Sequence, residues 1–191
     1  MSSSRGSRRA SASLKVDRSF GGRVPLSRVR IRQAKRQVRV LGLAVAELGG
    51  CFLPLGVVYR GCLGAEGVVG CRPCGGDAAE AVSEAVRGSP HYGQVRVLLL
   101  DLSRLPGGCA LDPFRLADLA GRPVLALGPE EAEVDGRYMF RWGAGTVTSA
   151  GLTEGDARGV LDAVSVDGYP EALRVAWLVA GALGGVGLHK V

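Results

Sequence analysis

The stretch "QVRVLLLDLSR", residues 94–104, decides the fold. Its apolar residues show no polar alternation, which predicts a strand buried on both faces, as in the parallel part of a sheet. The strand delivers one carboxylate, Asp101, at its downstream end, and open α/β sheets bind ligands at the carboxyl ends of their strands. Asp101 is therefore a candidate functional residue, unless it only caps the turn that follows.

Upstream of this strand lie three apolar, β-branched runs, at residues 38–48, 51–61 and 62–73. Short glycine-containing turns separate them, which is typical of an antiparallel meander.

Helical segments alternate with the later strands. Asp77 is a predicted N-cap with Glu80 in the capping-box position, and Asp112 with Pro113 begins a second helix. The remaining predicted elements are a strand at 122–128, two short strands within 136–151, and helices that start near Thr153 and Pro170. This order predicts an α/β protein whose mixed sheet combines a three-strand antiparallel meander with parallel strands, flanked by helices.

Charge divides the chain into two parts. Residues 1–39 carry a net charge of about +11 and the rest about −5, which together give the net +6 of the whole chain. Residues 1–36 form a basic arm, rich in Ser and Arg, that lacks the apolar content to fold and is predicted to be disordered. Residues 37–191 form the predicted folded domain.

The basic arm is a candidate contact for DNA or RNA, because Arg and Lys pair with phosphates and release their counterions. The alternative is a solvated terminus without a partner. The candidate nucleic-acid-binding residues are Arg5, Arg8, Arg9, Arg28, Arg30, Arg32, Lys35 and Arg36. The stretch "RYMFRW", residues 137–142, interleaves Arg with aromatic residues, which suits either base stacking or strand packing.

Composition indicates a soluble, cytoplasmic protein. Gly and Arg interrupt every apolar run before it reaches membrane-spanning length, and the N-terminus lacks a secretory signal. Asn is absent and Arg far outnumbers Lys, as in proteins of GC-rich genomes or hot habitats. The five cysteines include one CxxC, Cys71 to Cys74, for which free thiols, a stabilising disulfide and a redox pair all stay open.

Several stretches resemble a known family in the same order: "RVLGL", "PLGVVYRG", "EGVV", "GGDAAEAV", "QVRVLLLD", "PVLAL" and "PEALRVAWLVA". The family is the archaeal uncharacterised protein family 0215 (domain of unknown function 99), sometimes called endonuclease dU and similar to endonuclease V. The resemblance spans about residues 37–183 and identifies this chain as a divergent member. It implies a ribonuclease H-like fold, in agreement with the strand order above.

The resemblance also implies that carboxylates on neighbouring strands hold Mg²⁺ or Mn²⁺, which activates water for phosphodiester cleavage. Here the acid pair of the first strand is replaced by Ala44 and Val45. Asp101 matches a later acid of the family, and Glu66 lies where the family often has Asp. Glu47 is the remaining acid near the end of the first strand.

Three functions follow from these residues. The first is a nucleic-acid-binding protein with a degenerate metal site and no or weak cleavage. The second is an active metal-dependent endonuclease on damaged or single-stranded DNA, in which Glu47, Glu66 and Asp101 rebuild the site. The third is a non-catalytic scaffold that binds another protein.

Overall fold

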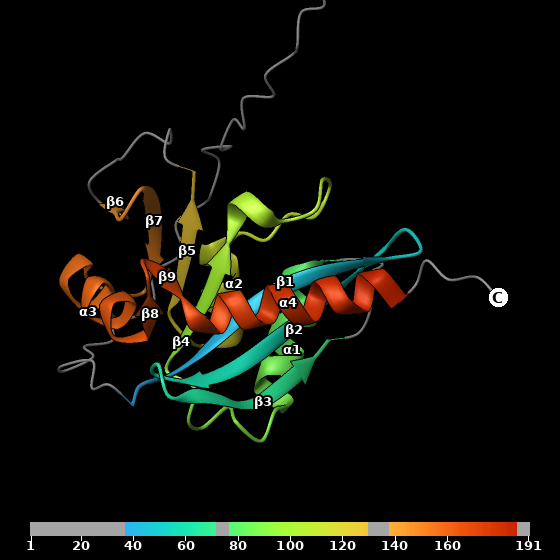
Figure 1. Cartoon of the computed structure of the whole chain (residues 1–191), viewed down its shortest axis with the longest axis horizontal. Coiled ribbons are helices and arrows are strands. Elements are labelled where there is room, and N and C mark those ends of the chain that lie inside the picture. Colours follow the sequence, from blue (N-terminus) through green and yellow to red (C-terminus); the bar gives the residue numbers. More distant parts are fainter. Residues whose placement is uncertain (1–36, 72–76, 130–137, 187–191) are drawn as a thin grey trace, which may run out of the picture.

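The computed structural model describes residues 37–71, 77–129 and 138–186, and a seven-stranded mixed sheet forms its centre (Figure 1). The strand order is β3-β2-β1-β4-β5-β7-β6. The basic arm, Cys74 and the first residue of "RYMFRW" lie outside the described residues. No helix among the described residues is long and apolar enough to cross a membrane.

The expected meander forms one half of the sheet. β1 (Arg39–Leu48) pairs antiparallel with β2 (Cys51–Arg60), and β2 pairs antiparallel with β3 (Gly64–Gly70). Gly49 and Gly50 form the first turn, and both have positive φ, as tight hairpin turns require. The meander prediction is confirmed, with β3 ending at Gly70, before the predicted residue 73.

The other half of the sheet is built on β4 (Val97–Asp101), which lies between β1 and β5 (Val124–Gly128) and is parallel to both. All five residues of β4 are buried, as its lack of alternation predicted. The two short strands also form: β7 (Gly145–Ala150) pairs antiparallel with β5, and β6 (Met139–Trp142) forms the outer edge.

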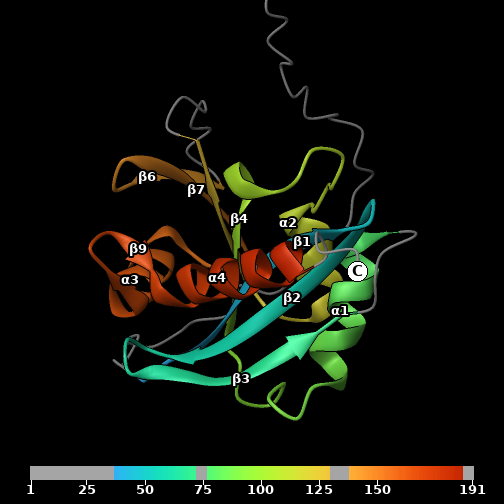
Figure 2. The same ribbon diagram turned by 45° about the vertical axis from the view of Figure 1, so that its right-hand side comes forward.

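Helices cover both faces of the sheet. α1 (Ala78–Gly88) and α2 (Pro113–Ala120) lie on one face, and α3 (Glu154–Val164) and α4 (Glu171–Val186) on the other (Figures 1 and 2). Side chains of β1 alternate between the two cores: Leu43 and Val45 pack on the side of α1 and α2, and Ala44 and Ala46 on the side of α3 and α4.

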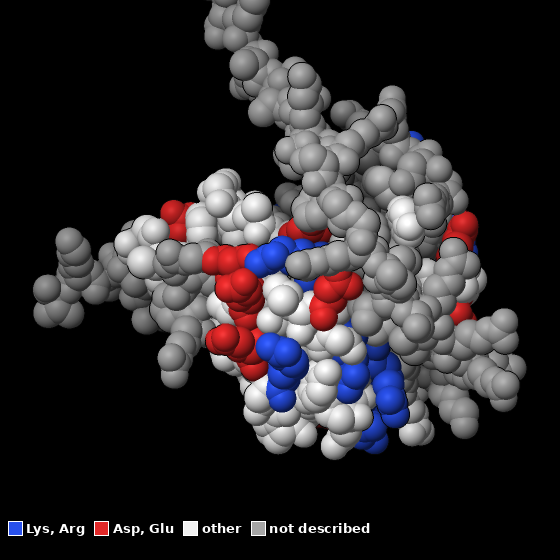
Figure 3. Space-filling model, turned by 180° about the vertical axis from the view of Figure 1, so that it is seen from behind, with Lys and Arg blue, Asp and Glu red and all other residues white. Residues whose placement is uncertain are grey.

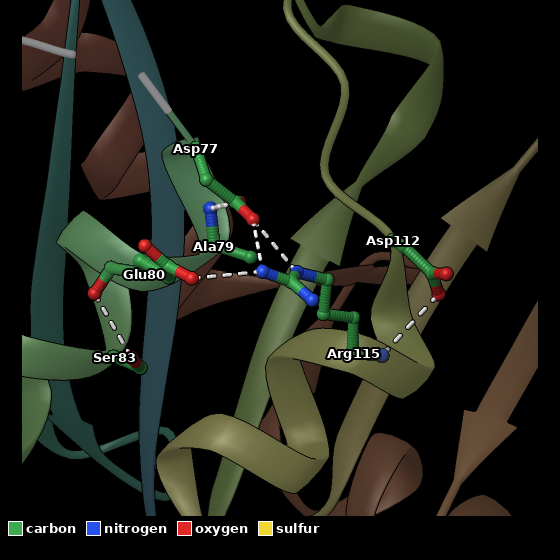
Figure 4. Close-up of polar contacts among 6 residues, drawn as sticks. All are labelled: Asp77, Ala79, Glu80, Ser83, Asp112 and Arg115. Atoms are coloured by element: carbon green, nitrogen blue, oxygen red, sulfur yellow. Dashed lines mark hydrogen bonds and ion pairs between the residues drawn. The ribbon is translucent and has the colours of Figure 1, made fainter. Parts of the chain in front are cut away.

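The helix starts follow the predicted cap chemistry. Asp77 accepts from the Ala79 amide, and Asp112 accepts from the Phe114 and Arg115 amides (Figure 4). Glu80, expected in a capping box, instead accepts from Arg115 at 2.9 Å, and the same guanidinium pairs with Asp77. Arg115 on α2 therefore ties together the N-terminal ends of both helices.

The Arg115 clamp also sets the charge state of Asp77. Burial acts to raise the pKa of Asp77, but hydrogen bonds from Arg115 and the Ala79 amide outweigh it, and the pKa lies below the usual Asp value. Asp77 therefore stays ionised at neutral pH, which keeps the clamp intact.

Gly42 allows α4 to lie directly against β1. A Cβ atom at this position would lie 2.3 Å from the Ala172 carbonyl carbon and 2.7 Å from the Leu173 amide nitrogen. Both are backbone atoms, so no side-chain rotation relieves the contact. Figure 2 shows the result, with α4 crossing the sheet over β1 and β2.

We predict that Gly42→Ala lowers the free energy of unfolding by about 1–3 kcal/mol, the usual cost of overpacking a core. Gly70→Ala is the matched control, because a Cβ on this strand glycine meets nothing within 4 Å. Urea denaturation of both variants checks the prediction. Equal stability of the two variants would contradict a close packing of α4 on β1.

Candidate functional site

The carboxylate of Asp101 is buried at the end of β4, with 5% of the residue exposed. One oxygen accepts a hydrogen bond from the Ser103 amide at 3.0 Å, and the other accepts from the Tyr169 hydroxyl at 2.6 Å. The first bond caps the single 3-10 turn η1 (Leu102–Arg104). Asp101 thus caps the following turn, as the sequence suggested.

A small hairpin that the sequence analysis missed brings Tyr169 to Asp101. Its strands are β8 (Ser165–Val166) and β9 (Tyr169–Pro170), which connect α3 to α4. The turn residues Asp167 and Gly168 have φ values of 51° and 79°. An Asp-Gly pair with two positive φ values is the preferred two-residue hairpin turn, and this signal was present in the sequence.

Tyr169 is held as a neutral hydrogen-bond donor. Burial raises the pKa of the Tyr169 phenol, and the hydrogen bond to Asp101 and the charge of that carboxylate raise it further. A hydrogen bond from Arg104 and its positive charge act in the opposite direction and lower the pKa of Tyr169. The Arg104 guanidinium itself lies over the Trp177 ring, 5.0 Å from the ring centre. At neutral pH the Tyr169 hydroxyl therefore keeps its proton and donates a hydrogen bond to Asp101.

A pocket of about 220 Å³ opens beside this pair, where β4 and β5 end. Its lining combines polar groups with an aromatic wall, and includes Asp101, Ser103, Leu127, Trp142, Thr146 and Tyr169. The Trp142 indole nitrogen donates to Asp162 at 3.0 Å, which anchors the ring to α3. The lining of the pocket thus includes two aromatic residues, Trp142 and Tyr169, together with a buried carboxylate.

β1, the strand beside Asp101, has apolar side chains and no charged side chain at the positions next to this carboxylate. Parallel pairing aligns Val40 with Val97 and ends at Leu43 with Leu100, so Ala44 occupies the next position, beside Asp101. Ala44 and Val45 are 1% and 2% exposed. Ala44 belongs to the same core as Leu99, which shows that it shares its face of the sheet with Asp101.

Glu47 points away from this face. It lies three residues after Ala44, and β1 pairs with β2 in unbroken register, so alternation places its side chain on the opposite side of the sheet. The residue is exposed. Glu47 and Asp101 therefore do not converge.

Glu66 lies at the far end of the sheet. It is the unpaired residue of a β-bulge in β3, and its carboxylate binds Arg39 at 2.6 Å and Arg60 at 2.9 Å. Arg39 precedes Ala44 by five residues, roughly 17 Å along a strand. The hydrogen bond from Arg39 holds the pKa of Glu66 below its usual value. Glu66 is thus a structural ion-pair partner in this arrangement.

A divalent metal does not fit the donor set around Asp101. Mg²⁺ requires several oxygen ligands in octahedral geometry. Both Asp101 oxygens already have hydrogen-bond partners, and no group of three His, Cys, Asp or Glu side chains that could hold a metal occurs among residues 37–71, 77–129 and 138–186. The three acids proposed from the sequence lie apart, on different faces and at different ends of the sheet.

On the face covered by α1 and α2, acidic and basic side chains lie largely in different areas (Figure 3). Among the described residues the basic side chains are all arginines, and several gather in its lower part, at the end where β1 and β4 begin. Arg87 in the last turn of α1 and Arg96 immediately before β4 are both exposed, and neither has an ion-pair partner in the part of the chain that the structure describes. The candidate cations of the arm, from Arg5 to Arg36, lie outside that part.

Comparison with known proteins found sequence relatives over part of the chain. No family model matches. A UPF0215 protein of Methanothermobacter thermautotrophicus is 34% identical over 106 residues, and one of Methanopyrus kandleri is 32% identical over 104 residues. These alignments cover 50% and 52% of this chain, and 50% and 53% of the two relatives. The chain thus spans about half the length of the curated relatives that it matches.

Solved structures show the same fold over most of the chain. A crystal structure of an Archaeoglobus fulgidus protein of unknown function aligns with a TM-score of 0.62 and 21% identity, covering 76% of this chain and 97% of that one. Ciona intestinalis endonuclease V, in complex with a DNA that contains inosine, aligns with a TM-score of 0.55 and 10% identity, covering 81% and 88%. The chain therefore shares the ribonuclease H-like fold of endonuclease V, and about half of it is similar in sequence to the archaeal UPF0215 proteins.

Proposed function

We propose that this protein binds nucleic acid and does not cleave it through a metal ion. The observation that carries the proposal is the state of Asp101, whose two oxygens are occupied by the Ser103 amide and the Tyr169 hydroxyl. Ala44, the neighbour on β1, offers no second carboxylate. Mg²⁺ and Mn²⁺ accordingly have no role in the proposed function.

The basic arm supports nucleic acid as the partner. Residues 1–36 precede β1 in the chain, and Arg96 lies beside the start of β1, where its amide donates to the Arg39 carbonyl. Arg96 and Arg87, in the last turn of α1, are exposed and have no ion-pair partner among the described residues. Positive charge gathered at one end of a protein attracts a polynucleotide and pairs with its phosphates. The related fold of Ciona endonuclease V binds DNA, which agrees with this partner.

The pocket beside Asp101 supports a contact with an unpaired base. A volume of about 220 Å³ suits one planar base, and Trp142 supplies a ring on which a base can stack. The hydrogen bond from Trp142 to Asp162 fixes the ring before a ligand arrives. Single-stranded DNA or RNA is thus the preferred form of the ligand, because a paired base cannot enter such a pocket.

Cleavage assays test the central claim. We expect the full chain to leave single-stranded and deaminated DNA and RNA intact with Mg²⁺ or Mn²⁺, while the same samples shift labelled strands in a binding assay. Asp101→Ala is the matched variant for any residual activity. Metal-dependent cleavage that disappears in this variant would overturn the proposal and restore the nuclease hypothesis.

A salt series tests the arm. Replacing its eight candidate cations by Gln in the full chain should flatten the plot of log affinity against log salt, by about 0.7 for each lost contact with a single strand. Arg158→Gln is the control, since this α3 arginine pairs with Glu154 and lies outside the arm. Negligible affinity of the wild type at low salt would instead favour a protein-binding scaffold.

The pocket is tested by substitution of its aromatic wall. Trp142→Ala should weaken binding of single strands by about 1–3 kcal/mol, the cost of losing one stacked base. Trp142→Phe keeps a ring but loses the hydrogen bond to Asp162, and should retain most of the affinity. Fluorescence anisotropy with a short labelled strand measures both. Equal affinity of the Ala variant and the wild type for the strand would show that the pocket is not part of the binding surface.

A further inference from the structure

We infer that the Tyr169 hydroxyl takes the place of a divalent cation on Asp101, so that the β8–β9 hairpin is a built-in plug that keeps cations out of the pocket. The inference deepens the proposed function at the same site and rests on it. It assigns Tyr169 as a positioning residue, which acts through Asp101 and holds that carboxylate without metal.

The hydrogen-bond arrangement is the first step of the argument. A buried carboxylate needs partners for its oxygens, because an unsatisfied charge in a protein interior is costly. Asp101 has one on each oxygen, and the Tyr169 bond of 2.6 Å has the length of a charge-assisted O–H···O⁻ bond. A cation approaching that oxygen would have to compete with the hydroxyl for its electron density.

The hairpin geometry is the second step. Two positive φ values at Asp167 and Gly168 fix the turn, and Pro170 and α4 follow Tyr169 at once. α4 is in turn anchored against β1 at Gly42. Tyr169 is therefore set in position by packing on both sides, and its burial keeps the phenol in the protonated form that donates the hydrogen bond.

The apolar neighbour is the third step. Ala44 lies beside Asp101 and faces the same side of the sheet. β1 therefore supplies no second carboxylate there, and both oxygens of Asp101 already accept a hydrogen bond. If the hydroxyl is the barrier, supplying a carboxylate at Ala44 alone will not create a metal site. Removing the hydroxyl must be part of the change.

The test measures binding of Mn²⁺ alone to the full chain, by titration calorimetry and by electron paramagnetic resonance. Four proteins are compared: wild type, Ala44→Asp, Tyr169→Phe, and the double variant Ala44→Asp/Tyr169→Phe. We expect the double variant to bind Mn²⁺ at least about tenfold more tightly than Ala44→Asp, the size of effect that groups around metal ligands usually have. Adding Asp101→Asn to the double variant should abolish this gain.

Two results would overturn the inference. One is Ala44→Asp binding Mn²⁺ as tightly as the double variant, which would show that the hydroxyl is no barrier while leaving the proposed nucleic-acid binding intact. The other is binding of Mn²⁺ by the wild type that is lost in Asp101→Asn. Tyr92→Phe is the matched control, because Tyr92 donates its hydroxyl to the Ala120 carbonyl at 3.0 Å, away from the pocket.

A measurement on the wild type covers the case in which the double variant does not fold. The chain has four tyrosines, so selectively labelled tyrosine rings give few resonances to assign. We expect added Mn²⁺ to leave the Tyr169 ring signal as sharp as that of Tyr92. Selective broadening of the Tyr169 signal would show that the ion binds beside Asp101. This result would contradict the inference that the β8–β9 hairpin keeps cations out of the pocket.

Discussion

The structure of the site depends on a single buried charge and the two groups that satisfy it. Asp101 ends the central strand inside the protein, and its carboxylate is stable there because the Ser103 amide and the Tyr169 hydroxyl both donate to it. One partner comes from the adjacent turn and the other from a hairpin 68 residues further along the chain. The bond between Tyr169 and Asp101 therefore links the end of the parallel strands to the start of α4 and fixes one side of the pocket.

Local patterns in the sequence account for most of the fold. The unbroken apolar run of β4 predicted a buried parallel strand, and the glycine turns predicted the meander, because both are set by residues close together in the chain. The caps at Asp77, Asp112 and Thr153 form as expected for the same reason. The two-residue strands β8 and β9 were missed, since so short a segment has no hydrophobic period, although its Asp-Gly turn is a recognisable signal.

The site was only partly predictable, because it depends on direction and distance across the sheet. Asp101 was identified from its place at the end of a strand, and Ala44 from the resemblance to a family with acids at that position. Glu47 and Glu66 were grouped with Asp101 because they are acids near strand ends, yet alternation turns Glu47 to the other face, and Glu66 lies beyond two intervening strands. The contact of Tyr169 with Asp101 has no counterpart in any local pattern.

The bulge at Glu66 has a consequence for how copies of this protein meet one another. An outer strand with free amides and carbonyls is a template on which a second chain can add, and straight outer strands promote aggregation for this reason. β3 is interrupted by the bulge, and the carboxylate there is held by two arginines. At the opposite margin, β6 is only four residues long. Both margins of the sheet are therefore poor templates for strand addition, which favours solubility in a protein whose interior is otherwise rich in β-branched residues.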